Sequence, residues 1–162
     1  MSRIVRLTRE HLSGVAELEQ LCFPAEPWSE SSLEVLCREH GIGYVALDED
    51  ETVLAYVGMT YAADEGSITN VATHPRARRQ GLGRAVVQSL MQQGGTLGLA
   101  EIYLEVRLSN APAIALYEAL GFATIATRKN FYRHPTEDAL LMKATLPTDT
   151  KQKKDNHSLC TF

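Results

Sequence analysis

Two side chains that could carry chemistry, a carboxylate and a phenol, stand in the stretch LEVRLSNAPAIALYEALGF, which spans residues 104–122. Glu105 lies in a predicted strand, and Tyr117 lies on the predicted helix that begins after Asn110. Alternate residues of the strand form an apolar face, so Glu105 points to the opposite face. A carboxylate there forms either a salt bridge with a neighbour such as Arg107 or part of a cleft wall. Tyr117 taken alone is more typical of core packing than of chemistry.

A second candidate is the loop RARRQGLGRA, which follows a predicted strand and precedes a predicted helix. Gly81 and Gly83 let the backbone approach a ligand closely, and the first N–H groups of the helix favour a phosphate. Arginines beside a helix start oppose the helix dipole, and a bound anion would explain them. The arginines are Arg76, Arg78, Arg79 and Arg84. From the loop alone, a glycine-rich turn with a solvated basic surface is an equally good interpretation.

Two nucleotide-binding motifs are disfavoured. GLGRAV matches only part of the dinucleotide pattern G-x-G-x-x-G, and the strands before it are predicted to be antiparallel. The sequence also lacks the G-x-x-x-x-G-K-[ST] pattern of ATP- and GTP-binding loops.

The predicted elements position both candidates at one place. Their order is β-α-α-β-β-β-α-β-α-β-β, a mixed α+β fold with an antiparallel meander, one β-α-β crossover and a closing hairpin. A right-handed crossover makes its two parallel strands neighbours, so the glycine loop and the Glu105 strand should meet at their carboxyl ends. The predicted strands are 3–7, three within 43–74, 100–108, 122–133 and 138–146. The predicted helices are 10–23, capped by Thr8; 30–40, capped by Ser29 and closed by Gly41; 84–95; and 110–120.

Composition limits the class of protein. The chain has 162 residues, of which 44% are apolar and 22% charged, and its net charge is −4. These values indicate one soluble domain, predicted at residues 1–146, and do not suggest nucleic-acid binding. Residues 147–162 read as a flexible polar tail. Three cysteines and five histidines show no spacing of a disulfide framework or metal site. Without a signal peptide or an apolar span, we expect a cytoplasmic protein.

Several segments of the sequence resemble the motifs of a known protein family. VATHPRARRQGLGRAVV resembles the acetyl-CoA signature R/Q-x-x-G-x-G/A of the GNAT N-acetyltransferases. CFPAEPWSESSL, ITNVATHPRARRQGLGRA, LEVRLSNAPAIALYEALGF and RKNFYRHPTEDALLMK resemble the bacterial RimI-type enzymes within it, which acetylate the N-terminal alanine of a small-subunit ribosomal protein. The resemblance covers about residues 4–145. It implies the GNAT fold: a central, mostly antiparallel seven-stranded sheet flanked by about four helices.

The resemblance also implies roles for individual residues. Glu105 matches the general base and Tyr117 the general acid. Acetyl-CoA is the implied co-substrate, no metal is expected, and an N-terminal peptide is the implied partner. Trp28 and Tyr132 are weaker candidates for the peptide groove, and Trp28 equally fits a hydrophobic staple before the second helix. The acetyl-CoA contacts are Val71, Ala72, Thr73, Arg79, Gln80, Gly81, Leu82, Gly83, Arg84 and Asn110.

Two features depart from the family pattern. Thr73-His74 stands where relatives often have an aliphatic residue and an acid, and the tail has no recognisable counterpart. Two alternative functions therefore stay open. One is a GNAT enzyme that acetylates another amine, such as an internal lysine, a polyamine or a small molecule. The other is a module that binds acetyl-CoA without turnover. The KQKK run in the tail reads as solvated rather than RNA-binding.

Overall fold

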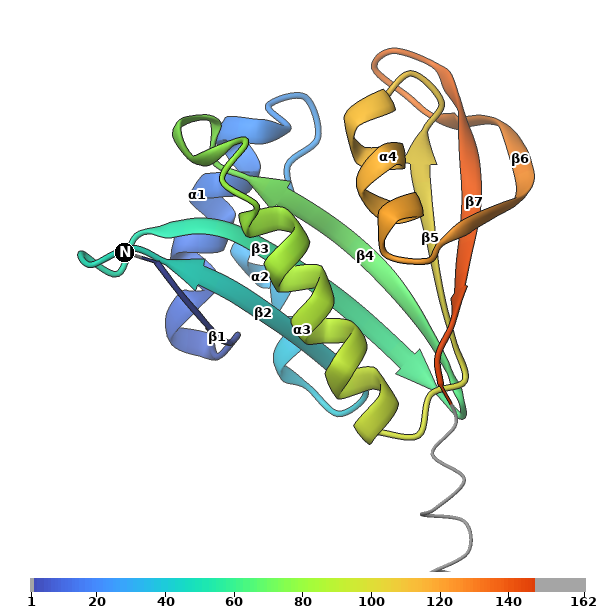
Figure 1. Cartoon of the computed structure of the whole chain (residues 1–162). Coiled ribbons are helices and arrows are strands. Elements are labelled where there is room, and N and C mark those ends of the chain that lie inside the picture. Colours follow the sequence, from blue (N-terminus) through green and yellow to red (C-terminus); the bar gives the residue numbers. More distant parts are fainter. Residues whose placement is uncertain (1, 148–162) are drawn as a thin grey trace, which may run out of the picture.

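The computed structural model describes residues 2–147 and shows a seven-stranded sheet with helices on both faces (Figure 1). The strand order is β1-β2-β3-β4-β5-β7-β6, and all neighbours are antiparallel except β4 and β5. This architecture confirms the mixed, mostly antiparallel sheet that the sequence predicts. The strands are β1 (Arg3–Arg6), β2 (Gly41–Leu47), β3 (Val53–Ala62), β4 (Glu65–Thr73), β5 (Glu101–Arg107), β6 (Ala123–Tyr132) and β7 (Glu137–Thr145). The helices are α1 (Leu12–Cys22), α2 (Glu30–Leu33), α3 (Leu82–Thr96) and α4 (Ala111–Ala119), with 3-10 helices η1 (Arg9–His11), η2 (Glu34–Cys37) and η3 (Pro75–Ala77).

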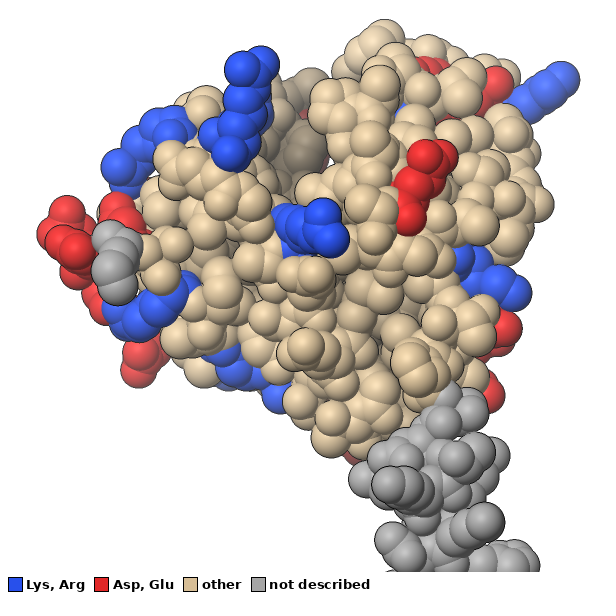
Figure 2. Space-filling view, in the orientation of Figure 1, with Lys and Arg blue, Asp and Glu red and all other residues tan. Residues whose placement is uncertain are grey.

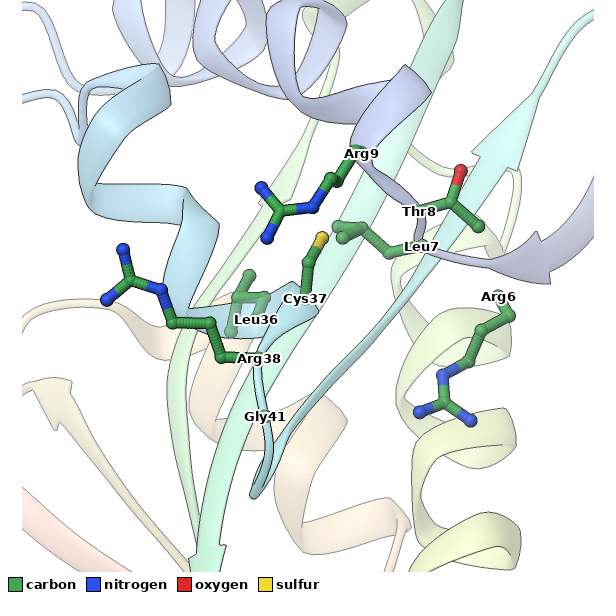
Figure 3. A pocket seen from close by; sticks show the side chains of 8 residues that line it. All are labelled: Arg6, Leu7, Thr8, Arg9, Leu36, Cys37, Arg38 and Gly41. Atoms are coloured by element: carbon green, nitrogen blue, oxygen red, sulfur yellow. The ribbon is translucent and has the colours of Figure 1, made fainter.

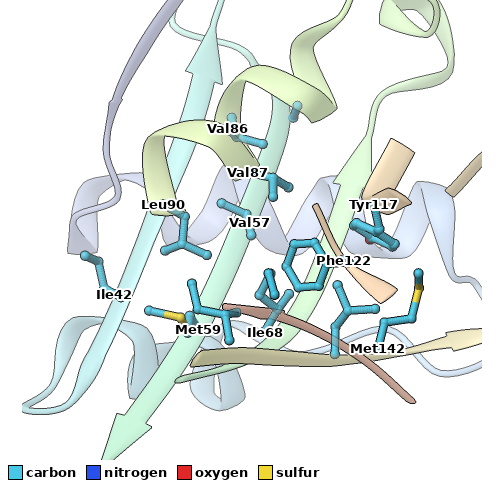
Figure 4. Packing of buried hydrophobic residues seen from close by; sticks show 14 of the residues in the cluster. Ile42, Val57, Met59, Ile68, Val86, Val87, Leu90, Tyr117, Phe122 and Met142 are labelled. Carbon is cyan, nitrogen blue, oxygen red and sulfur yellow. The ribbon is translucent and has the colours of Figure 1, made fainter. Parts of the chain in front are cut away.

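Side chains that alternate along the strands form two apolar layers, one on each face of the sheet. Helices α1 and α2 cover one layer, which contains Leu18, Leu33 and Tyr56. Helix α3 covers the other layer, and burial of each large apolar side chain there stabilises the fold by about 1.5–3 kcal/mol. This second layer includes Ile42, Val57, Met59, Val86, Val87 and Leu90 (Figure 4).

The parallel strands β4 and β5 separate soon after they begin. They pair only at Glu65–Glu101, Gly66–Ile102 and Ser67–Tyr103. A bulge in β4 then shifts its register with β3, and the two strands diverge toward their carboxyl ends (Figure 1). The predicted neighbours are therefore correct, but their carboxyl ends do not lie edge to edge. The edge of β4 that faces β5 has no strand partner beyond Ser67.

The second helix is shorter than predicted. It is a single α-turn, Glu30–Leu33, followed by the 3-10 turn Glu34–Cys37, although Ser29 caps it as predicted by accepting the Ser32 N–H at 3.1 Å. Gly41 does not close the helix but begins β2. A Cβ at Gly41 would lie 2.0 Å from the carbonyl oxygen of Val35, so glycine is needed where the backbone of η2 crosses close to the strand.

Within residues 2–147, none of the helices has the length and apolar character needed to cross a bilayer. The predicted tail, 147–162, lies almost wholly outside the described residues.

Candidate active site

The start of α3 is open to a ligand. Gly81 precedes the helix with φ +76°, a left-handed conformation that glycine adopts without strain, and no side chain caps the first N–H groups. A Cβ at Gly83 would lie 3.0 Å from Thr73 Oγ1 and 3.7 Å from Leu116 Cδ1. The helix start therefore lies closely against the end of β4 and beside α4. These unpaired donors and the positive end of the helix suit a phosphate group.

The arginines of this loop have different partners. Arg76 pairs with Asp48 at 2.9 Å, so its charge is compensated in the β2–β3 turn. Arg78 lies against the Cys22 thiol. Arg79, with φ +67°, and Arg84 have no carboxylate partner among residues 2–147, and both are exposed. Positive charge thus stays available on both sides of Gly81, where an anion would contact the helix start.

The unpaired edge of β4 is less free than the sequence suggests. The Val71 N–H donates to the side-chain oxygen of Asn70 at 3.0 Å, and the Cys22 thiol donates to the Thr73 carbonyl at 3.4 Å. We expect backbone N–H groups near Val71–Thr73 to polarise a thioester oxygen. A ligand oxygen at Val71 would have to share or displace the Asn70 amide oxygen. Ala72 points the other way, into the layer under α1.

Glu105 lies on β5 with 29% of its side chain exposed. Its ion-pair partner is Arg128 of β6, at 3.5 Å from Arg128 Nε to Glu105 Oε1. The salt bridge that the sequence allows is thus present, but Arg107, the neighbour named as an example, is not its partner. The Arg107 guanidinium instead binds Glu137 at 3.3 Å and packs 4.4 Å from the ring centre of Tyr132. Strand β7 lies between β5 and the edge strand β6, so the Arg128 side chain reaches across β7 to Glu105. Glu105 is thus both paired and accessible.

Tyr117 is 8% exposed and its ring makes an edge contact with Phe122, with 5.8 Å between ring centres. Burial and the nearby Tyr132 raise the pKa of its phenol, so it stays protonated at neutral pH and can donate a proton. Burial and the negative charge of Glu105 raise the pKa of Tyr132 to about 12, and Arg107 opposes the rise. Tyr132 therefore lies within electrostatic reach of both Tyr117 and Glu105.

The two remaining predicted residues lie at the borders of this region. Asn110 caps α4, and its side-chain oxygen accepts the Ala113 N–H at 3.3 Å. Trp28 is half-buried in the layer under α1, in the same apolar cluster as Leu33, which fits the predicted staple. The loop that carries Trp28 also approaches the β6–β7 turn, where Glu26 and His134 lie 3.4 Å apart.

One residue with an unusual environment was not predicted. Glu19 of α1 is fully buried, and its carboxyl accepts hydrogen bonds from Tyr56, Asn70 and the Trp28 N–H. The only sign of its burial in the sequence is weak: Glu19 is next to Leu18, which lies on the buried face of α1. A glutamate on a surface helix is ordinarily solvated, which hides such a residue.

Two cavities lie apart from the predicted residues. One, of about 360 Å³, is lined by Arg6, Leu7, Thr8, Arg9, Leu36, Cys37, Arg38 and Gly41 (Figure 3). Arg9 and Arg38 both pair with Glu34, at 3.8 and 3.3 Å, and burial raises the pKa of the Cys37 thiol. The other, of about 390 Å³, contains Glu17, Glu51 and His74. In the described part of the chain, no cluster of three or more His, Cys, Asp or Glu residues is arranged to hold a metal ion.

The surface is hollowed where β4 and β5 diverge, between the part that carries α3 and the part that carries α4, and basic side chains project beside the hollow (Figure 2). The helix start with its unpaired arginines belongs to the β4 side, and Glu105 with Tyr117 belongs to the β5 side. The arrangement provides an anion site, a carboxylate and a protonated phenol around one gap. Such groups suit transfer of an acyl group between a phosphate-bearing donor and an amine.

Comparison with known proteins gives a consistent family. The model of the acetyltransferase (GNAT) family matches residues 12–122. The chain is 37% identical to the [ribosomal protein bS18]-alanine N-acetyltransferase of Escherichia coli K12 over 146 residues, which are 88% of this chain and 96% of that protein. It is 36% identical to the protein of that name in Salmonella typhimurium, with the same coverage. The crystal structure of the E. coli ribosomal-protein-S18-alanine N-acetyltransferase superposes with a TM-score of 0.85 at 33% identity and covers 93% of this chain and 97% of that one. The chain therefore belongs to the GNAT acetyltransferase family.

Proposed function

We propose that the protein is an acetyl-CoA-dependent N-terminal acetyltransferase that modifies the α-amine of an N-terminal alanine on a small-subunit ribosomal protein. The observation that carries the proposal is the 37% identity with the E. coli bS18-alanine N-acetyltransferase across 88% of the chain. The stretch from Glu105 to Tyr117 lies inside both this match and the family match.

The acetyl-CoA side of the proposal uses the β4 edge and the start of α3. Residues Gln80 to Arg84 contribute backbone N–H groups and charge to the pyrophosphate, with Arg79 beside them. Gly83 has no Cβ, so α3 can lie against Thr73 and α4. Val71, Ala72 and Thr73 run along the pantetheine arm, and Asn110 makes a further contact from α4. The open helix start and its unpaired arginines fit the phosphate groups of acetyl-CoA.

The β5 side carries the proton transfers. Glu105, through a water molecule, accepts a proton from the amine as its nitrogen attacks the thioester carbon. The carbon–sulfur bond then breaks, and Tyr117 donates its proton to the leaving thiolate. Tyr117 suits this role because burial keeps its phenol protonated. No covalent bond to the enzyme is required, and Cys22, whose pKa burial raises, is a poor nucleophile.

This machinery suits an α-amine better than a lysine. An α-amine has a pKa of about 7.7–8.0, so a sizeable fraction is neutral near pH 7.5, whereas lysine has a pKa of about 10.4. Glu105 keeps an arginine partner and solvent contact. A carboxylate is a weak base. It can deprotonate the first amine far more readily than the second.

The test compares two peptides by intact mass after incubation with acetyl-CoA. Both begin with alanine and contain one internal lysine, and one has its α-amine blocked. The proposal predicts that the peptide with the free α-amine gains one acetyl group, a mass increase of about 42 Da, and that the blocked peptide gains none. Acetylation of the blocked peptide would instead support an enzyme for lysines or small amines. If acetyl-CoA released no free thiol in the presence of either peptide or of any small amine, the result would favour a binding module.

A further inference from the structure

Glu19 is the one charged side chain that is completely buried in the described residues, with 0% exposure. It lies on α1 among the apolar residues that pack under this helix, which include Val15 and Leu18. Removal of a carboxyl from water costs several kcal/mol unless its oxygens are well hydrogen-bonded. A residue that is retained at such a cost calls for a role, and the proposed chemistry at Glu105 and Tyr117 does not use it.

The two oxygens of Glu19 serve different parts of the fold. Oε1 accepts hydrogen bonds from the Tyr56 hydroxyl of β3 and the Asn70 amide of β4. Oε2 accepts the backbone N–H of Trp28 at 3.4 Å, in the loop between α1 and α2. All three partners are donors, so both oxygens must act as acceptors. One carboxyl therefore joins the sheet to the loop.

The contacts continue from Glu19 toward the unpaired edge of β4. Asn70 uses its amide nitrogen on Glu19 and its amide oxygen on the Val71 N–H, at 3.0 Å. Since both ends of this amide are engaged, its orientation is fixed. On the loop side, the half-buried Trp28 side chain packs against the apolar layer under α1, and the preceding residues have few other attachments. Residues 23–26 are exposed, Glu26 N–H bonds back to the Phe23 carbonyl at 3.2 Å, and the Glu26–His134 pair lies at the surface.

We propose that Glu19 is a positioning residue that holds the 24–28 loop, through Trp28, in the place where the acceptor peptide binds. This inference rests on the proposed function, because that function gives the loop its role as a wall of the peptide groove. The Glu19 carboxyl sets the loop against β4, and so fixes the distance between the acceptor side and the acetyl-CoA side. Glu19 touches neither substrate, and it acts through Trp28 and Asn70.

Glu19→Gln separates the two halves of this role. The glutamine oxygen can still accept from Tyr56 and Asn70, but its NH₂ group then faces the Trp28 N–H, donor against donor. The loop should be released while the contacts to the sheet persist. We expect the KM for an alanine-initiated peptide to rise about tenfold, with kcat and the Kd of acetyl-CoA within about twofold of wild type.

Tyr56→Phe is the matched control. It removes a donor from the same carboxyl on the sheet side and leaves the Trp28 contact in place. This variant should lower Tm and leave the peptide KM unchanged. Equal increases in KM for Tyr56→Phe and Glu19→Gln would show that the carboxyl acts only through general stability and would overturn the proposal. A Glu19→Gln protein that fails to fold would do the same, because the proposal requires the sheet contacts to persist.

Amide hydrogen exchange gives a second readout that needs no substrate. The Trp28 N–H should exchange about tenfold faster in Glu19→Gln than in wild type and at the wild-type rate in Tyr56→Phe. Unchanged exchange in Glu19→Gln would overturn the anchoring. If the wild-type protein acetylates no N-terminal peptide, the proposed function fails, and the exchange comparison still decides whether Glu19 holds the loop.

Discussion

The β1–β4 half of the sheet and the β5–β7 half pair at three positions only, and they present different groups to the gap between them. The first half presents backbone: the open start of α3, the glycines at 81 and 83, and the edge of β4. The second half presents side chains: Glu105, which is paired with Arg128 and partly exposed, and Tyr117, whose pKa is raised by burial so that its phenol stays protonated. Backbone N–H groups can bind an anion or polarise an oxygen, whereas a carboxylate and a phenol can also accept and donate protons. We therefore infer that the first half mainly binds and the second mainly reacts.

The difference also appears in burial. Strands β2 and β3 lie in the middle of the first half, and nearly all their residues are buried. Strand β6, at the outer edge of the second half, is exposed along almost its whole length. The reactive half is thus a three-stranded unit with an open edge. Substitutions in this half should therefore be judged against controls for stability.

Tyr117→Phe tests the reactive half and should give an effect as large as any substitution in this site. Phenylalanine keeps the ring contact with Phe122 and removes only the hydroxyl, so kcat should fall about 100-fold while acetyl-CoA affinity changes less than about twofold. Thiol-release kinetics and calorimetric titration measure the two quantities. Tyr103→Phe on β5, which loses a hydroxyl bound to Glu101, is the control and should keep its kcat. If Tyr117→Phe weakened acetyl-CoA binding as much as it lowered kcat, the assignment of binding and reaction to different halves of the sheet would be wrong.

Gly83→Ala tests the binding half. The new Cβ would lie 3.0 Å from Thr73 Oγ1 and push α3 away from β4, so the Kd of acetyl-CoA should rise about tenfold. At saturating acetyl-CoA, kcat should stay near the wild-type value. Gly95→Ala, later in the same helix and with no atom near its new Cβ, is the matched control and should bind normally. A fall in kcat without a change in the Kd of acetyl-CoA would contradict the account, because it would show that the β1–β4 half takes part in the reaction rather than in binding.

Arg128→Ala should have a small effect. The pair with Glu105 spans 3.5 Å, and 52% of the Arg128 side chain is exposed, so solvent screens much of the interaction. We expect kcat/KM to change by less than about fivefold, and the change to shrink in high salt. Arg3→Ala, which removes the distant pair with Glu51, should have no effect on kinetics. A loss as large as that of Tyr117→Phe would make Arg128 part of the chemistry.

The pH dependence of kcat should show no titration of Tyr117 near pH 10, where a tyrosine ordinarily loses its proton. Burial raises the pKa of its phenol above the usual value of about 10, so the acid form persists to higher pH. The value of kcat should therefore stay level between about pH 8.5 and 10. Steady-state rates at saturating substrates measure this range. A fall with an apparent pKa near 10, present in wild type and absent in Tyr117→Phe, would show an unperturbed phenol.

The elements that the sequence predicts correctly depend on local patterns. The glycines that precede α3 and the apolar alternation along β5 each involve only a few neighbouring residues. The sequence predicts a salt bridge as one fate of Glu105 but does not identify Arg128 as its partner, because the register of β6 against β7 brings Arg128 close and no local pattern encodes that register. Glu19 was missed for a similar reason: its three donors come from residues 9, 37 and 51 positions away. Gly41 was misassigned because the crossing of η2 over β2 is a tertiary contact.

The most direct test of the whole account is a single-turnover measurement with Glu105→Gln bound to acetyl-CoA and mixed with an alanine-initiated peptide. Glutamine preserves the shape of the side chain but cannot accept the amine proton. The account predicts wild-type affinity for acetyl-CoA and transfer to the α-amine that is about 100-fold slower. Transfer at the wild-type rate would contradict the assignment of Glu105 as the base and, with it, the division of the sheet into a binding half and a reactive half.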